Sequence, residues 1–117
     1  REHADHIAEI RVYVFGRERG TCRICRIRPA ESMHELVARS VGGKVSKRNS
    51  VAVCGNGVAG CHGLIQRHEI QWAENYGVGA QGPLTFTPIS RTAADWLRVN
   101  VGHQIESLPM SAYENAE

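Results

Sequence analysis

Residues 49–62 have the sequence NSVAVCGNGVAGCH, the part of the chain that is most informative about its fold. Its first five residues alternate and include two valines, which predicts a strand over residues 49–53. The part between Cys54 and Cys61 contains three glycines and is predicted to be irregular. The stretch therefore predicts a strand that runs directly into a pair of cysteines, with His62 immediately after the second.

A second pair of cysteines upstream has the two-residue spacing of a metal-binding knuckle. Zinc takes four thiolates in a tetrahedron, and a short spacer lets two of them reach one ion. The six-residue spacer of the later pair is longer than usual, but its glycines allow the chain to fold back. The sequence therefore predicts one structural Zn²⁺ ion held by all four cysteines of the chain, Cys22, Cys25, Cys54 and Cys61.

Two disulfides or a redox-active CxxC motif are the alternatives to zinc. The N-terminus is charged and has no signal-peptide core, so we expect a cytoplasmic protein whose thiols stay reduced. The surroundings of Cys22 and Cys25 do not resemble a thioredoxin unit, which disfavours a redox role. No apolar run is long enough to cross a membrane, so no membrane partner is expected.

Hydrophobic periodicity predicts the remaining elements and an α+β fold class. In chain order they are a helix over 6–15, a strand over 32–37, a strand over 49–53, a helix over 62–76, a strand over 84–87 and a helix from a cap at Ser90 or Thr92 to Val101. The first two strands are expected to pair as a hairpin with a long basic loop through Gly42 and Gly43. Residues 105–117 are expected to form a loose tail, which leaves one domain over 1–104.

Positive charge is concentrated in the first half of the chain. The net charge is only +2, but residues 11–48 hold ten arginines and lysines against three acids. Such a segment suits a polyanionic partner, although a solvated, helix-stabilising surface would have the same composition.

Five short motifs follow one another in a specific order: Cys22-x2-Cys25, His34-Glu35, Gly42-Gly43, Asn49-x4-Cys54 and Cys61-His62. Over residues 13–76, which would form the core, this order resembles the HNH endonucleases, also called His-Me finger or ββα-metal nucleases. It is most similar to small phage-type members that carry a four-cysteine zinc site. The resemblance implies a ββα-metal finger with a zinc-bound four-cysteine cluster and flanking helices. It also implies hydrolysis of double-stranded DNA, in the host-cell cytoplasm if the gene is phage-borne, with phage packaging proteins as possible partners. Low sequence specificity is expected because the sequence shows no appended recognition domain.

Phosphodiester hydrolysis needs a base that deprotonates water and a metal that stabilises the leaving alkoxide. Imidazole titrates near neutral pH and suits the base. The resemblance implies that His62 binds the catalytic metal and that Asn49 fixes the hairpin loop so that the base is oriented. His68, six residues after His62, or Gln66 is a further candidate ligand; a histidine on the helix face near the core is the alternative for His68.

The pair His34-Glu35 departs from the family pattern of Asp-His or His-His and leaves two assignments open. In one, His34 is a metal ligand and Glu35 occupies the position of the base. In the other, which we prefer at this stage, His34 is the base and Glu35 supplies a carboxylate ligand. A free carboxylate is a weaker base than imidazole, and carboxylate oxygen suits Mg²⁺ or Mn²⁺.

The basic loop between the two hairpin strands is predicted to meet DNA backbone phosphates through Arg39, Lys44, Lys47 and Arg48. The alternative functions are a non-catalytic zinc-ribbon DNA-binding module and a degenerate HNH fold without activity. Cysteines and basic residues alone would fit a zinc ribbon. They do not account for His34, Asn49 and His62 together.

Overall fold

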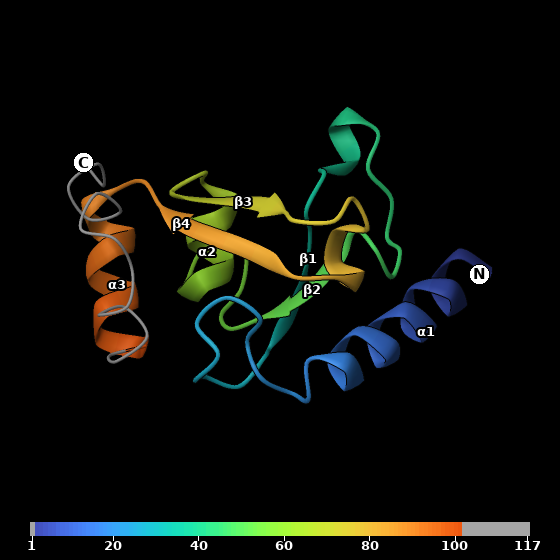
Figure 1. Ribbon diagram of the computed structural model, residues 1–117. Helices are drawn as coiled ribbons and strands as arrows, with labels where there is room; N and C mark the ends of the chain where they lie inside the picture. The colour runs from blue at the N-terminus through green and yellow to red at the C-terminus, as the bar shows by residue number, and fades with distance from the viewer. Residues whose placement is uncertain (1, 102–117) are drawn as a thin grey trace.

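The computed structural model describes residues 2–101 and has three helices and two small antiparallel sheets (Figure 1). The predicted α+β class is therefore confirmed, whereas the predicted tail at 105–117 lies outside the described residues. The elements in chain order are α1 (Glu2–Arg17), β1 (Ser32–Glu35), η1 (Arg39–Val41), β2 (Ser50–Val53), α2 (Gly60–Gln66), β3 (Ile70–Glu74), η2 (Gly79–Gln81), β4 (Leu84–Pro88) and α3 (Arg91–Val101), where η denotes a short 3₁₀ helix. Within this part of the chain, no helix has the length and apolar character that crossing a membrane requires.

The predicted hairpin is formed by β1 and β2, which pair antiparallel with His34 opposite Val51 and Met33 opposite Ala52. Because side chains alternate between the faces of a strand, the two pairs point in opposite directions. Met33 and Ala52 pack in one apolar cluster with Ile10 and Val14 of α1. On the opposite face, Val51 and Val53 of β2 join a larger cluster with apolar residues of α2, β3 and α3: Leu64, Ile65, Ile70, Ala93 and Leu97. The hairpin is thus covered on one face by α1 and on the other by α2.

The predicted helix over residues 62–76 is wrong beyond Gln66. Arg67 caps α2, and His68 takes a left-handed conformation with φ of 63°, so the helical path ends there. The chain then enters β3, in which Ile70 is fully buried and Gln71 is exposed. β3 pairs antiparallel with the predicted strand near residue 84, which is β4, with Trp72 opposite Phe86. A small sheet therefore replaces the second half of the predicted helix.

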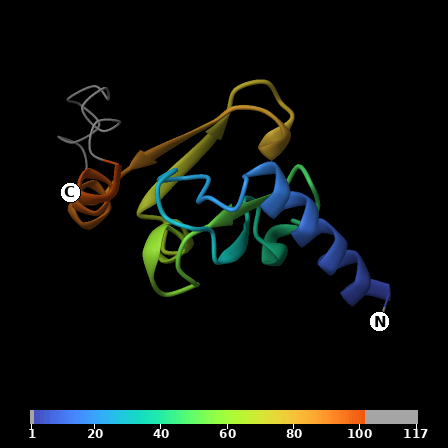
Figure 2. The ribbon, with the colours of Figure 1, turned by 90° about the horizontal axis from the view of Figure 1, so that it is seen from below.

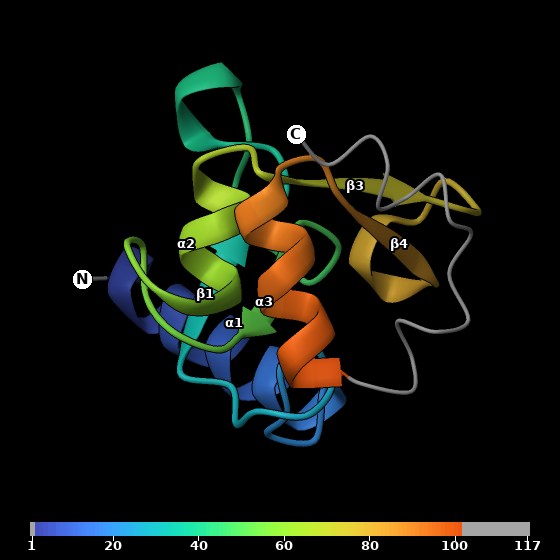
Figure 3. The same ribbon diagram turned by 90° about the vertical axis from the view of Figure 1, so that its left-hand side faces the viewer.

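The two outer helices follow the prediction. α1 contains the predicted 6–15 segment and extends it at both ends. α3 begins after Ser90, whose hydroxyl accepts a hydrogen bond from the Ala93 amide at 3.0 Å, so Ser90 is the cap. The two helices lie at opposite ends of the molecule (Figures 1 and 2), and α2 and α3 lie on the same side of it (Figure 3).

Candidate metal centre and histidine site

The four cysteines meet between the knuckle at residues 22–25 and the start of α2. All four are buried and free of disulfides, and their sulfur atoms lie within 4.8 Å of one another. A tetrahedral ion with metal–sulfur bonds of about 2.3 Å would separate its ligand sulfurs by about 3.8 Å, so the donor set fits such an ion. Four buried cysteines are therefore close enough together to hold a metal ion such as zinc, as the spacing predicted.

The long spacer between Cys54 and Cys61 closes through local hydrogen bonds. The side-chain oxygen of Asn56 accepts bonds from the Val58 and Ala59 amides at 2.9 and 3.0 Å. Gly55 has φ of 81°, and a Cβ atom built there would lie 2.0 Å from the Ala59 carbonyl oxygen. Only glycine fits this position, which explains how six residues return the chain to Cys54.

Backbone and indole N–H groups point at the sulfurs. The amides of Cys25 and Cys61 donate to the sulfurs of Cys22 and Cys54 at 3.5 and 3.4 Å. The indole N–H of Trp96, on α3, donates to the sulfur of Cys61 at 3.3 Å. Such bonds stabilise negative charge on a sulfur ligand. The contact with Trp96 links α3 to the cluster, and nothing in the spacing of the cysteines predicted it.

The thiols influence one another strongly because they are so close. The side-chain hydrogen bond with Cys22 raises the pKa of the Cys54 and Cys61 thiols. The hydrogen bond with the same Cys22 lowers the pKa of Cys25 well below its usual range. Four adjacent sulfurs do not all carry negative charge unless a cation lies among them, which is the role of a metal in such a cluster.

Trp96→Phe is expected to weaken zinc binding without removing it. Losing one hydrogen bond to a sulfur ligand costs about 1 kcal/mol, or roughly fivefold in affinity. Competition with a chromogenic zinc chelator measures the change. Trp72→Phe is the matched control, because the Trp72 indole donates instead to the Leu36 carbonyl at 3.1 Å. Equal zinc affinity in Trp96→Phe and the unmodified protein would show that the N–H···S bond has no energetic role.

His34 and His62 lie side by side between β1 and α2. Their ring centroids are 5.3 Å apart, with an angle of 73° between the ring planes. The strand register places His34 on the face that packs against α2, and His62 follows Cys61 in the first turn of that helix. Both rings line a hollow of about 280 Å³ together with Glu35 and Gln66. The structure thus brings together two histidines that are far apart in the sequence.

Ser32 orients the ring of His62, and sequence reasoning missed it. The Ser32 hydroxyl lies 2.6 Å from Nδ1 of His62 and 2.7 Å from the Gly55 carbonyl oxygen. A carbonyl only accepts, so the single hydroxyl hydrogen goes to Gly55 and the Nδ1 of His62 must carry the proton that Ser32 accepts. This tautomer leaves the Nε2 lone pair free for a metal ion. Ser32 lies two residues before His34 on the same strand face, which is the signal that could have identified it.

Both histidines favour the neutral form. Burial lowers the pKa of His34 from 6.5 to about 4, and the nearby His62 ring adds to this, while a hydrogen bond with Gln66 opposes it. Burial also lowers the pKa of His62, and the negative charge of Glu35 opposes that shift. Neutral imidazole is the form that binds metal ions, so this pair suits metal ligation near neutral pH.

Glu35 and His68 lie near the histidine pair but do not complete a three-residue ligand cluster with it. The Glu35 carboxylate accepts a hydrogen bond from Nε of Arg39 at 3.0 Å. His68 is exposed, and with His34 and Glu35 it lines an adjoining hollow of about 490 Å³. Across residues 2–101, only the four cysteines form a group of three or more His, Cys, Asp or Glu side chains close enough to hold a metal ion.

Asn49 closes the loop between the two hairpin strands. Its side-chain oxygen accepts a hydrogen bond from the Val37 amide at 2.8 Å, and its amide nitrogen donates to the carbonyls of Val37 and Lys44 at 3.0 and 2.9 Å. Gly43 approaches so closely that a Cβ atom there would lie 1.7 Å from the Val37 oxygen. One amide side chain thus holds both sides of the loop that follows His34 and Glu35.

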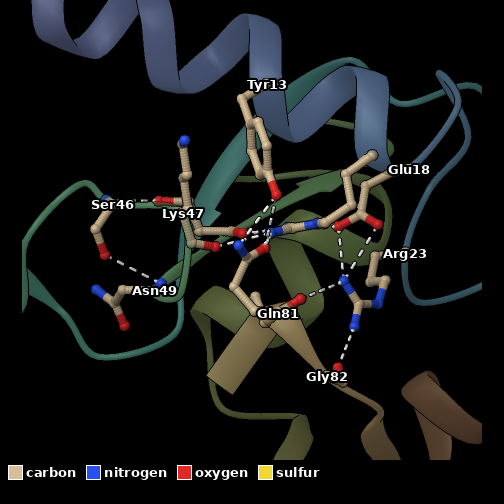
Figure 4. A network of polar contacts seen from close by, with 11 residues as sticks. Tyr13, Glu18, Arg23, Ser46, Lys47, Asn49, Gln81 and Gly82 are labelled. Carbon is tan, nitrogen blue, oxygen red and sulfur yellow. Dashed lines mark hydrogen bonds and ion pairs between the residues drawn. The ribbon is translucent and has the colours of Figure 1, made fainter. Parts of the chain in front are cut away.

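Three of the four basic residues predicted to contact DNA make contacts within the protein. Arg39 pairs with Glu35, and Arg48 donates to the Gly77 carbonyl at 2.9 Å. The Lys47 ammonium lies 4.4 Å from the centroid of the Tyr13 ring (Figure 4). Lys44 is exposed. These four positions surround the loop, and their contact with DNA stays a prediction.

No protein-family model, curated protein or solved structure matches this chain. The resemblance to HNH endonucleases therefore depends on the order of the five motifs.

Proposed function

We propose that this chain is a metal-dependent endonuclease of the HNH type that hydrolyses phosphodiester bonds in DNA. The observation that carries the proposal is the pairing of His34 with His62 at a centroid distance of 5.3 Å beside a hollow. Two further features support it. The order β1, β2 and α2 is the one expected of a ββα-metal finger. Asn49 holds the intervening loop in the way that the family resemblance implies.

We assign Zn²⁺ to the cysteine cluster. Four thiolates in a tetrahedron are the donor set that structural zinc prefers. Cys61 precedes His62 directly, and the amide of His62 donates to the Cys54 carbonyl at 3.0 Å. A zinc ion that fixes Cys54 and Cys61 therefore also fixes the position of His62 relative to the hairpin. Its role in this proposal is structural.

His34 and His62 would hold the second metal. Two imidazoles bound to one ion at about 2.1 Å place their ring centroids about 5 Å apart, which agrees with the observed separation. A divalent ion held there would polarise the scissile phosphate and stabilise the leaving alkoxide. Ser32 keeps the Nε2 atom of His62 unprotonated for this purpose. We therefore assign His34 as a ligand, which reverses the preference drawn from the sequence.

Glu35 is then the proton acceptor. Arg39 occupies Oε1 of the carboxylate, while Oε2 accepts no hydrogen bond from the described residues. Glu35 lines the same hollow as the two histidines, where water and a phosphate can enter. With imidazole rather than carboxylate ligands, the site is expected to work better with Ni²⁺ or Co²⁺ than with Mg²⁺. His68 lines the adjoining hollow and is not assigned a ligand role.

The proposal is tested by nicking of supercoiled plasmid DNA with the zinc-loaded protein. We expect open-circular product only when a divalent metal is added, and faster nicking with Ni²⁺ or Co²⁺ than with Mg²⁺. His62→Ala protein purified in parallel controls for contaminating nucleases. DNA binding without cleavage under every metal would contradict the proposal and favour the zinc-ribbon module or a degenerate HNH fold. Faster cleavage with Mg²⁺ would instead favour a carboxylate ligand.

A further inference from the structure

A separate cavity of about 630 Å³ lies where the end of α1, the cysteine knuckle and η2 meet. It shares no lining residue with the hollows around His34 and His62. Its ionisable lining, apart from Cys22, consists of one acid, Glu18, and four arginines, Arg17, Arg19, Arg23 and Arg26. The excess of positive charge at this cavity is not explained by the histidine site.

The floor of the cavity is formed by a network of ion pairs and hydrogen bonds around Glu18. Its carboxylate accepts bonds from Arg17 and Arg23 at 2.8 and 2.9 Å, and its side chain is 5% exposed. Arg23 also donates to the carbonyls of Ala80 and Gly82 at 3.1 and 2.7 Å (Figure 4). The only acid of the cavity is therefore already neutralised by two guanidinium groups. It does not offset the charge of the other two arginines.

Arg19 and Arg26 form the rim. Both are exposed, and neither guanidinium makes a hydrogen bond or ion pair with any residue in the described part of the chain. Both also have left-handed backbone, with φ of 57° and 61°, a conformation that glycine adopts without strain. The remaining non-glycine residue with positive φ among residues 2–101 is His68, which lines the hollow beside His34. Backbone strain of this kind is concentrated at functional sites in proteins.

We propose that this cavity binds phosphate groups, with Arg19 and Arg26 as the residues that contact the ligand. Guanidinium groups match phosphate oxygens in bidentate geometry, and three excess positive charges suit a polyanion better than a single carboxylate. The cavity volume is in the range of sites for nucleotide-sized ligands. The phosphate can come from a nucleic-acid backbone or from a small polyphosphate. Because the two sites share no residue, this inference does not depend on the proposed nuclease activity.

The double variant Arg19→Gly/Arg26→Gly tests the inference in the full-length, zinc-loaded protein. Glycine removes both guanidinium groups and relieves the left-handed backbone, so the melting temperature should stay the same or rise. Calorimetric titration with pyrophosphate, without added divalent metal, is expected to show binding that is at least about tenfold weaker in this variant. The control Arg67→Gln/Arg98→Gln removes the same charge outside the cavity and should bind like the unmodified protein. His62→Ala should also bind pyrophosphate normally.

A second measurement identifies the source of the phosphate. The salt dependence of binding to a 20-base-pair duplex is followed by fluorescence anisotropy. A slope that falls by about 2 in the double-glycine variant supports a nucleic-acid backbone as the ligand. An unchanged slope together with weaker pyrophosphate binding supports a small polyphosphate. The inference is overturned if pyrophosphate fails to bind the unmodified protein, if it binds the double-glycine variant with unchanged affinity, or if His62→Ala loses the binding.

Discussion

Cys22→Ser is expected to lose the bound zinc and with it the cooperative thermal unfolding transition. Structural zinc sites contribute about 10 kcal/mol or more of apparent binding free energy at neutral pH, whereas whole domains are stable by only about 5–15 kcal/mol. The four cysteines are all buried, and they join the knuckle to the start of α2. Elemental analysis measures zinc per chain, and circular dichroism during heating measures the transition.

The control for this experiment is Val58→Ser, which changes an exposed side chain in the loop between Cys54 and Cys61 and leaves every sulfur in place. It should retain one zinc per chain and melt like the unmodified protein. A Cys22→Ser variant that keeps its zinc and its melting temperature would refute the assignment. So would peptide mapping that finds two disulfides in the native protein.

The hairpin and the cysteine cluster could be predicted because their signals are local. The alternation and the valines of residues 49–53 predicted the strand, and residues 50–53 form β2, in which all four are buried. The glycines between Cys54 and Cys61 predict that the chain folds back there, and Gly55 makes this possible by adopting a left-handed backbone conformation. Spacing and residue type were sufficient to predict the strand and the cysteine cluster, because each depends on backbone conformation within a few residues.

β3 could not be predicted because two periods fit the same residues. Leu64, Ile65 and Trp72 fit a helical stripe, while Ile70 and Trp72 also fit the alternation of a strand. The pairing partner decides between them, and β4 lies more than ten residues further along the chain. His68, which occupies the left-handed position that ends α2, carries no glycine-like signal in the sequence.

Long-range contacts explain the other omissions at the candidate sites. Trp96 reaches Cys61 across 35 positions of the chain, and its spacing from the cysteines follows no motif. The concentration of positive charge over residues 11–48 is visible in the sequence. Its division into a loop surface and an arginine-lined cavity is not, because it depends on contacts of Arg23 with Ala80 and Gly82. The sequence does not distinguish arginines that form ion pairs within the protein, such as Arg17 and Arg23, from exposed ones such as Arg19 and Arg26.

His34→Ala and His62→Ala are each expected to reduce metal-dependent DNA cleavage by roughly a thousandfold or more, because both remove a group at the reacting centre. Zinc content should be unchanged in both, since neither histidine is among the four sulfur ligands. His6→Ala is the matched control, because His6 is an exposed histidine on α1 away from both sites. Initial rates of plasmid nicking measure the effect. Cleavage by both variants at the rate of the unmodified protein would contradict the hypothesis that the chain is an enzyme.

Calorimetric titration of the zinc-loaded variants with Ni²⁺ separates the roles of the three side chains. If His34 and His62 share the ion, both alanine variants lose the Ni²⁺ binding isotherm, whereas Glu35→Gln keeps it and loses cleavage. If His34 is the base instead, His34→Ala keeps the isotherm and Glu35→Gln weakens it, which restores the assignment first drawn from the sequence.

The effects of mutating residues that act as one unit are not additive, so the double variant at His34 and His62 should cleave little more slowly than either single variant. Additive losses would mean that the two rings, although their centroids lie 5.3 Å apart, act independently.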